Sequence, residues 1–417
     1  MSASPRDAAG EAMASGPTAQ LWAGDALATL DRLAAEGTQV DLIHLDPPFG
    51  SEAAYDRKVT LRAADLSLTL RAYDDRDGDD LAGYLEILYA VLCRGRDVLA
   101  PHGSLYLHLD PRRGPYARVL LDEIFGPDNF VNQVIWAYAL GGSSRRNFQR
   151  KHDVIYLYAR DRKRMYFAPP QEAATSSMLA GQGKLATDTW ETSGREDDAE
   201  LLRAWPDELV RKTLSNRDPE RTGYPTQKPL ALATRMVSAS CPLGGLVVDP
   251  MSGSATLAVA AVLLGRNAIA GDRGAIARDV ARARLLSAGA TVQIDTLDDH
   301  LEVMPWRGPA PIRVAAGEVA LTTPQFPAEV AKAVAAAVVG AASQRALLAL
   351  AARDGAALWS GWGLADANDP TQLVVWADAG PGRDRATVRR HVPWPTRAAA
   401  PVWWGIDVLG RLWRWPA

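Results

Sequence analysis

The short, mainly apolar run Val40–Leu45, which ends at Asp46-Pro47-Pro48-Phe49, constrains the fold of this chain more than any other feature. A run of this length predicts a strand that is buried on both faces, as in parallel sheets covered by helices on each side. Ligands of open α/β sheets bind at the carboxyl ends of the strands. We therefore expect the Asp-Pro-Pro-Phe turn to lie at a binding edge.

The chemistry of this turn suits a planar base that carries an exocyclic amine. Asp46 supplies a carboxylate and Phe49 an aromatic ring for stacking. Pro47 and Pro48 fix φ and lack N–H groups, so the turn is rigid and its carbonyls are free acceptors. Taken alone, the tetrapeptide is more often a plain proline turn after a strand, and the rest of the chain favours the functional interpretation.

Strands alternate with helices along most of the chain, which predicts an α/β fold with a doubly wound, mostly parallel sheet. The predicted strands cover residues 20–23, 40–45, 104–109, 131–136, 154–158, 245–248 and 268–270. The predicted helices cover residues 26–33, 81–99, 116–125, 230–239, 254–264 and 275–286.

Changes in composition divide the chain into three parts. We expect a disordered tail over 1–18, an α/β domain over 19–298 with a polar insertion at 161–222, and a C-terminal accessory domain over 299–417. The accessory domain begins with an Ala-rich segment that predicts a helix over 327–353, and a Trp-rich region follows. The tryptophans indicate a small core; a base-stacking or dimerising surface is the alternative.

The composition is that of a globular protein, with 47% hydrophobic and 23% charged residues. Neither a membrane-length apolar run nor a secretory signal is visible, so a cytoplasmic location is expected. The two cysteines, Cys93 and Cys241, fit a reducing compartment and lack metal-ligand spacing, so we expect no metal site.

A net charge of −3 is not that of a generally basic nucleic-acid binder. DNA contacts would need a local basic surface, and one segment is rich enough in cations to provide it; a solvated charged face is the alternative. Its candidate residues are Arg145, Arg146, Asn147, Arg150, Lys151, His152, Arg162, Lys163 and Arg164.

A second motif, Val247–Thr256, predicts a strand, a loop of small residues and the start of a helix. Such a loop lets a ligand approach the backbone and the first helical N–H groups. Asp272 ends the next strand, where a carboxylate can hold ribose hydroxyls. Upstream, in Tyr224–Pro229, Lys228 could pair with a carboxylate. A plain strand–turn–helix with a surface Asp would share these features.

Together these motifs, in this order, resemble the β class of DNA amino-methyltransferases, which modify adenine-N6 or cytosine-N4 and include the methylation subunits of type III restriction systems. The resemblance covers about residues 20–295. Asp46–Phe49 matches the catalytic motif, and Asp249–Thr256 matches the cofactor loop that follows it about 200 residues later. Tyr224–Pro229 and Gly24-Asp25 match two shorter motifs. The fold implied is a Rossmann-like methyltransferase domain with a permuted motif order.

The resemblance implies S-adenosylmethionine as the cofactor. Asp25, with Ala26, would meet its adenine and Asp272 its ribose. The remaining cofactor residues implied are Asp46, Thr226, Lys228, Asp249, Pro250, Met251, Ser252, Gly253, Ser254 and Thr256. Met251 and Ala255 depart from the family, which usually has Phe and Gly there, and Ala255 adds a methyl group to a tight loop.

The resemblance also implies the reaction, with Asp46, Pro47, Pro48 and Phe49 as catalytic residues acting on a base flipped out of duplex DNA. Asp at the first motif position favours adenine-N6; cytosine-N4 is the alternative. There are two rival interpretations: a DNA-binding module without catalytic activity, and an enzyme that methylates RNA or protein. Cytosine-C5 chemistry is disfavoured, because Cys241 precedes a proline instead of following one.

Double-stranded DNA is the expected partner, and the resemblance is compatible with a homodimer and a cognate restriction nuclease. By its position, the insertion at 161–222 is expected to recognise the target sequence. We hypothesise that the C-terminal domain or a second subunit shares the DNA contact.

Overall fold

The structure is a computed structural model. It describes residues 17–50, 53–61, 66–75, 80–138, 145–173, 183–190, 214 and 218–296. In the C-terminal part it describes residues 304–305, 312–315, 318–321, 338, 344–349, 359–366, 373–378, 384–385, 391–393, 401–407 and 412–415.

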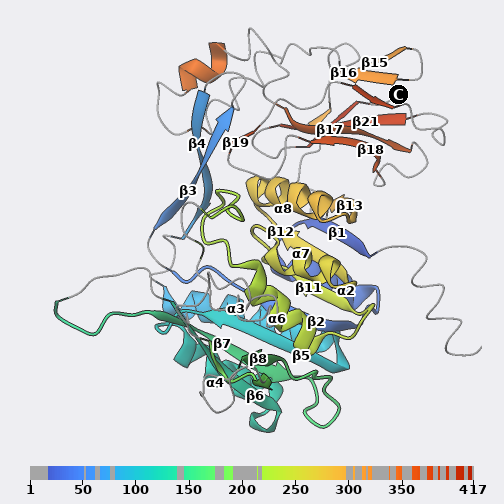
Figure 1. Ribbon diagram of the computed structural model, residues 1–417. Helices are drawn as coiled ribbons and strands as arrows, with labels where there is room; N and C mark the ends of the chain where they lie inside the picture. Colours follow the sequence, from blue (N-terminus) through green and yellow to red (C-terminus); the bar gives the residue numbers. More distant parts are fainter. Residues whose placement is uncertain are drawn as a thin grey trace, which may run out of the picture.

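A nine-stranded sheet in the order β10-β6-β7-β5-β2-β11-β12-β1-β13 forms the centre of the α/β domain (Figure 1). Among these described strands, β7 alone is antiparallel to its neighbours, so the predicted mostly parallel α/β fold is confirmed. The strands are β1 (Thr18–Ala23), β2 (Val40–Leu45), β5 (Leu99–Leu109), β6 (Phe130–Ala137), β7 (His152–Ala159), β10 (Thr189–Trp190), β11 (Leu246–Asp249), β12 (Asn267–Asp272) and β13 (Thr291–Thr296).

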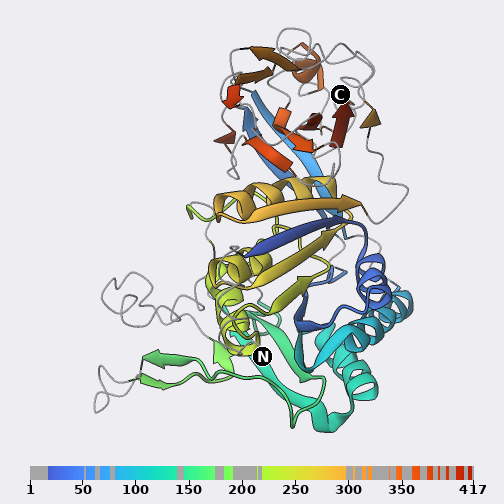
Figure 2. The ribbon, with the colours of Figure 1, turned by 90° about the vertical axis from the view of Figure 1, so that its right-hand side faces the viewer.

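Helices cover both faces of this sheet, as the continuous burial of β2 requires (Figure 2). On one face, a core of Leu and Val side chains joins the sheet to α2 (Ala26–Ala35), α3 (Leu81–Val98) and α4 (Gly114–Phe125). On the other face, a second core joins it to α6 (Leu230–Ser240), α7 (Thr256–Leu263) and α8 (Ala275–Ser287). Among the described helices, none is long and apolar enough to cross a membrane.

A hairpin of β3 (Ala54–Leu61) and β4 (Leu66–Asp74) follows the Asp-Pro-Pro-Phe turn and links the two parts of the chain. It extends from the α/β domain toward the C-terminal strands (Figures 1 and 2). There β19 (Asp384–Arg385) pairs with β3, and Leu70 forms an isolated bridge with Val338. At its other end, the buried Arg57 lies 3.8 Å from the Asp279 carboxylate of α8.

The described C-terminal residues form mainly strands. One sheet has the order β14-β22-β21-β17-β18 and a second β15-β16-β20. The strands are β14 (Met304–Pro305), β15 (Ile312–Ala315), β16 (Glu318–Leu321), β17 (Trp359–Asp366), β18 (Leu373–Asp378), β20 (His391–Pro393), β21 (Pro401–Asp407) and β22 (Leu412–Trp415). The structure does not describe the tryptophan side chains of these strands, so the roles predicted for them stay predictions.

Two sequence predictions need correction. A continuous helix over 327–353 is wrong, because Val338 pairs with Leu70 and helix is described only at 344–349. Tertiary pairing overrides the helix propensity of alanine at this point. The predicted tail ends earlier than 18: Thr18 begins β1, and its N–H and hydroxyl both donate to Asn267 Oδ1. The rest of the tail lies outside the described residues.

The insertion at 161–222 is described in part. Its β8 (Gln171–Ala173) and β9 (Gly183–Leu185) form a small hairpin. Its β10 pairs in parallel with β6 and so extends the edge of the central sheet. Target recognition by this segment stays a prediction.

Candidate active site

The two main motifs of the sequence meet at one edge of the sheet, because β2 and β11 are neighbouring parallel strands. The turn at Asp46 follows β2, and the loop at Asp249 follows β11. Between them lies a cavity of about 1000 Å³. All predicted catalytic and cofactor residues line it: Asp25, Ala26, Asp46, Pro47, Pro48, Phe49, Thr226, Lys228, Asp249, Pro250, Met251, Ser252, Gly253, Ser254, Thr256 and Asp272.

Asp46 is paired with Lys228 inside this cavity. Lys228 Nζ donates to Asp46 Oδ2 at 2.5 Å, and the two side chains are only 14% and 20% exposed. Burial by itself raises the pKa of Asp46, but the charge of Lys228 and its hydrogen bond oppose burial and hold this pKa below its ordinary value. Asp46 is therefore a carboxylate, and its Oδ1 has no hydrogen-bond partner among the described residues.

Contacts from three other elements fix the turn after Asp46. Arg113 Nε donates to the Phe49 carbonyl at 3.2 Å, and the Gly50 N–H donates to Asp75 Oδ1 at 3.0 Å. The Phe49 ring lies nearly parallel to the His108 ring, with centroids 6.3 Å apart and an interplanar angle of 25°. These contacts set the direction of the ring that would stack on a base.

The loop after β11 follows the sequence prediction closely. Gly253 has φ +50°, and a Cβ there would lie 3.2 Å from the Tyr224 ring, so the position is tight. Ala255, the departure from the family, adopts a left-handed backbone with φ 56° and is fully buried. This conformation costs a non-glycine residue about 1–2 kcal/mol, which explains the family preference for glycine.

Two further carboxylates that line the cavity lie at the ends of the neighbouring strands β1 and β12 and also organise the backbone. Asp25 caps α2, with its Oδ1 accepting from the Ala28 N–H at 2.8 Å. Asp272 accepts from the Gly253 and Gly274 N–H groups at 2.9 and 2.7 Å. Burial raises the pKa of Asp272 above its ordinary value although these N–H groups oppose it. Because each carboxylate oxygen accepts more than one bond, a ribose could still use Asp272.

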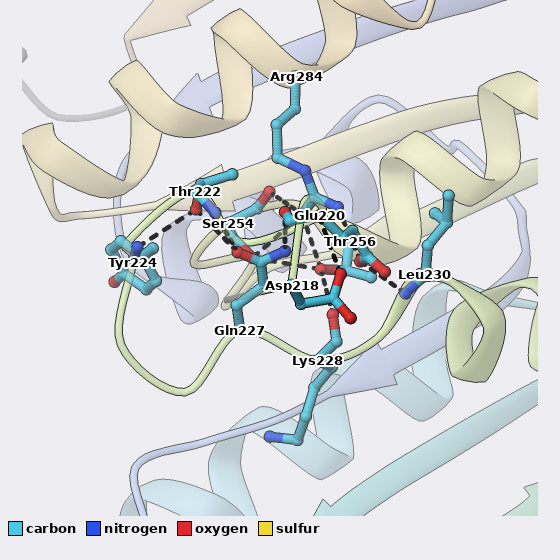
Figure 3. A network of polar contacts seen from close by, with 10 residues as sticks. All are labelled: Asp218, Glu220, Thr222, Tyr224, Gln227, Lys228, Leu230, Ser254, Thr256 and Arg284. Atoms are coloured by element: carbon cyan, nitrogen blue, oxygen red, sulfur yellow. Dashed lines mark hydrogen bonds and ion pairs between the residues drawn. The ribbon is translucent and has the colours of Figure 1, made fainter. Parts of the chain in front are cut away.

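A buried network centred on Arg284 of α8 joins the Lys228 segment to the cofactor loop (Figure 3). Its Nη1 donates to the Ser254 carbonyl at 2.8 Å and to Thr256 Oγ1 at 2.8 Å. Its Nη2 lies 3.6 Å from Glu220 Oε1. Burial lowers the pKa of the Arg284 guanidinium to about 10. Thr256 Oγ1 in turn donates to the Lys228 carbonyl at 3.2 Å.

The cavity has unused polar groups of the kind that a polar cofactor or a base would need. Ser252 Oγ, Asp46 Oδ1 and His44 Nε2 are buried without a hydrogen-bond partner among the described residues, while His44 Nδ1 lies 3.6 Å from Asp249 Oδ2. Leaving buried polar atoms unpaired is costly, so such atoms indicate a ligand. The volume also falls within the usual range of about 300–1000 Å³ for ligand pockets.

Several cavity residues were not predicted from the sequence. His44 lines the cavity two residues before Asp46, and strand alternation could have identified it, since both side chains point to one face. Tyr73 of β4 lines it as well, with its hydroxyl 3.1 Å from Thr226 Oγ1. Tyr84 of α3 completes that wall. Neither tyrosine lies in a motif, so no local signal pointed to them.

The basic residues predicted to contact DNA are divided between two edges of the sheet. Because β6 runs parallel to β5, the segment after β6 emerges at the edge that carries Asp46. That segment contains Arg145, Arg146, Asn147, Arg150, Lys151 and His152. Arg162, Lys163 and Arg164 follow the antiparallel β7 and lie at the opposite edge, where the Arg162 N–H donates to Asn129 Oδ1. The structure does not bring these two groups together.

The free cysteines take no part in the cavity. Cys241 is buried beside Pro242, and burial raises the pKa of its thiol to about 12. A thiol with this pKa is a poor nucleophile at neutral pH.

Comparison with known proteins gives consistent matches. The family model described as DNA methylase, of the N6/N4 class, matches residues 40–281. The type II methyltransferase M.EcaI of Enterobacter cloacae is 26% identical over 319 residues, which cover 63% of this chain and 68% of that protein. The DNA adenine methyltransferase YhdJ of Escherichia coli is 25% identical over 249 residues, covering 59% and 75%.

Solved structures also resemble the chain. The M1.HpyAVI–SAM complex aligns with a TM-score of 0.42 and 18% identity, over 64% of this chain and 99% of that one. The cytosine-N4-specific PvuII DNA methyltransferase aligns with a TM-score of 0.42 and 13% identity, over 69% and 89%.

Proposed function

The chain belongs to the DNA methylase family, and from this we propose that it transfers a methyl group from S-adenosylmethionine to the exocyclic N6 amine of adenine in double-stranded DNA. One observation carries the proposal. The ionised Asp46 places an unpartnered oxygen in the same cavity as the small-residue loop Asp249–Thr256. An amine acceptor and a cofactor loop thus share one cavity.

The loop and its neighbours fit S-adenosylmethionine. Asp25 and Asp272 are carboxylates at the cavity wall that suit an adenine amine and ribose hydroxyls. Ser252 Oγ, which lacks a partner among the described residues, and Thr226 suit the polar methionine end. When bound, this cofactor supplies an electrophilic methyl group on a sulfonium.

The protein's own contribution is to make a poor nucleophile react. The lone pair of an aromatic amine is delocalised into the ring. Asp46 Oδ1 and the Pro47 carbonyl would accept its two N–H bonds, bias nitrogen toward tetrahedral geometry and aim the lone pair. The gain is positioning together with stabilisation of the positive charge that grows on nitrogen. Lys228 keeps Asp46 ionised, and Phe49 would stack on the base.

The depth of the site supports base flipping as part of this proposal. Asp46 is only 20% exposed, so a base held within a duplex could not reach it. The basic segment at the same edge of the sheet, which includes Arg145, Arg146 and Arg150, is then suited to hold the phosphates of the duplex. Arg162, Lys163 and Arg164 are not part of this proposed surface.

Adenine is favoured over cytosine because Asp46 occupies the first motif position. Both amines present the same two donors, so cytosine-N4 is the second candidate. A homodimer, a cognate nuclease and a cytoplasmic location stay predictions. Light scattering of the purified chain tests the first of them.

The decisive experiment offers duplex DNA, RNA and protein in parallel to the purified chain with tritiated S-adenosylmethionine. Mass spectrometry then identifies the methylated nucleoside. We expect N6-methyladenine from DNA, and N4-methylcytosine would select the second candidate. Asp46→Ala should abolish transfer and leave calorimetric binding of the demethylated cofactor largely intact. Substantial transfer by this variant, or no cofactor binding by the wild type, would contradict the proposal.

A further inference from the structure

A buried histidine–carboxylate pair lies behind the proposed transfer site. His108 of β5 is fully buried, and its Nε2 lies 3.0 Å from Asp153 Oδ2 of β7. The Tyr138 hydroxyl donates to the other oxygen of Asp153 at 3.1 Å. His108 and Asp153 lie in the segments 103–108 and 151–158, which resemble intervening strands of the family, and the mechanism above uses neither side chain.

Strand register places His108 beside Asp46. In the β2–β5 ladder Leu45 pairs with Leu107, so the next residues, Asp46 and His108, lie at the same level. Neighbouring strands are about 4.8 Å apart, and residues at one level share a face of the sheet. Asp153 lies on the same face, two residues before Ile155, which pairs with His108. The pair therefore lies on the same side of the sheet as the catalytic carboxylate.

Aromatic neighbours fix the His108 ring on three sides. Phe49 lies nearly parallel to it, while His44 and Trp136 meet it edge-on at 80° and 85°. The ring centroids are 5.6–6.3 Å from that of His108. A change in the position or charge of His108 would thus reach Phe49, the ring proposed to stack on the base.

The bond to Asp153 determines which nitrogen of His108 can accept a proton. Burial raises the pKa of Asp153, but the hydrogen bond from His108 and the charge of Lys228 oppose burial and lower this pKa, so Asp153 is ionised and only accepts. Nε2 must therefore carry the hydrogen, which leaves the lone pair on Nδ1. Nδ1 is buried and has no partner among the described residues. His108 is thus a base with its acceptor unused.

The charges around His108 keep it neutral but able to be protonated. Burial, followed by the Lys228 charge, lowers the pKa of His108, while Asp153 and Asp46 raise it. His44 of β2 is the remaining titratable neighbour. At neutral pH the ring is uncharged, and Asp153 is positioned to stabilise the imidazolium that protonation would form.

We propose that Asp153 and His108 form a proton-holding pair that receives, through Asp46, the proton displaced from the target amine. This inference depends on the proposed function. As the N–C bond forms, the C–S bond breaks and its electron pair stays on sulfur, giving a neutral thioether. The amine proton passes to Asp46 Oδ1. Because Asp46 Oδ1 and His108 Nδ1 are not hydrogen-bonded to each other, its onward transfer to Nδ1 requires a bridging water or a rotation of the Asp46 side chain. Asp46 is thereby restored as a carboxylate, and His108 acts as a positioning residue behind it.

Two variants separate this role from packing. His108→Gln keeps a donor at the place of Nε2 for Asp153 and removes the titratable Nδ1. Asp153→Asn keeps the shape of the carboxylate and removes its charge, which should lower the pKa of His108 further. The readout is the single-turnover rate of methyl transfer to DNA between about pH 5 and pH 9, with binding of the demethylated cofactor as a check on folding.

For the wild type we expect a rate that falls in acid as His108 becomes protonated. Asp153→Asn should move this acid limb to lower pH. His108→Gln should abolish the limb and slow transfer by about 10- to 100-fold, with cofactor binding retained. A wild-type rate in the Gln variant, an acid limb that persists in that variant, or an unmoved limb in Asp153→Asn would overturn the proposal. Absence of transfer by the wild type would instead refute the proposed function.

Discussion

Removing Lys228 should destabilise the protein by leaving the Asp46 carboxylate without its cation. Breaking a fully buried ion pair by loss of one partner costs about 3–5 kcal/mol, whereas an exposed pair is worth about 0–1 kcal/mol. The Nζ–Oδ2 distance is 2.5 Å and the side chains are 14% and 20% exposed, so this pair lies nearer the buried case. We expect Lys228→Met to lower the free energy of unfolding by about 2–3 kcal/mol at neutral pH.

The pH dependence has a definite sign. In the wild type the pKa of Asp46 is lowered, so the pair stabilises the fold above the unfolded-state pKa, and this is lost as pH falls through the folded-state pKa. Without Lys228, burial raises the pKa of Asp46 and the carboxylate becomes destabilising. The difference in the free energy of unfolding between variant and wild type should therefore shrink as the pH falls from neutral toward the unfolded-state pKa of an aspartate.

Urea unfolding of the full chain, followed by circular dichroism, measures these differences. Lys163→Met, at an exposed lysine on the opposite edge of the sheet, is the matched control and should change stability by less than about 0.5 kcal/mol. The double variant Lys228→Met/Asp46→Asn should be more stable than Lys228→Met alone, because the unpaired charge is gone. A double variant that is no more stable than the single one, or a Lys228→Met variant as stable as the control, would contradict this expectation.

Two further predictions test the DNA surface and the Arg284 network. Replacing Arg145 and Arg146 together by alanine should reduce the slope of log affinity for DNA against log salt by about 2, whereas the same change at Arg162 and Lys163 should leave it unaltered. Equal changes of the salt slope for the two double variants would contradict the proposal that only the edge carrying Asp46 contacts DNA. Arg284→Lys, which cannot reproduce the fork of donors to Ser254 and Thr256, should weaken calorimetric binding of the demethylated cofactor about tenfold. Unchanged binding in this variant would show that the Arg284 network does not contribute to cofactor binding.

Much of the site could be predicted from the sequence because its signals are local. The apolar run Val40–Leu45 predicts a buried strand, and a parallel strand must end at the ligand-binding edge. The loop Asp249–Thr256 likewise predicts a ligand site, because its small residues let a ligand approach the backbone. Neither inference needs to know which strands are neighbours. The predicted catalytic and cofactor residues accordingly all line one cavity.

The tertiary structure alone decided the contacts between distant segments. Lys228 reaches Asp46 across 182 residues of sequence, and His108 meets Asp153 across a strand pair. The division of the basic residues also depends on β7 being antiparallel, which reverses the edge at which its following turn emerges. Sheet order, strand direction and register fix these outcomes. They come from the packing of the whole domain, so the spacing of residues along the chain does not contain them.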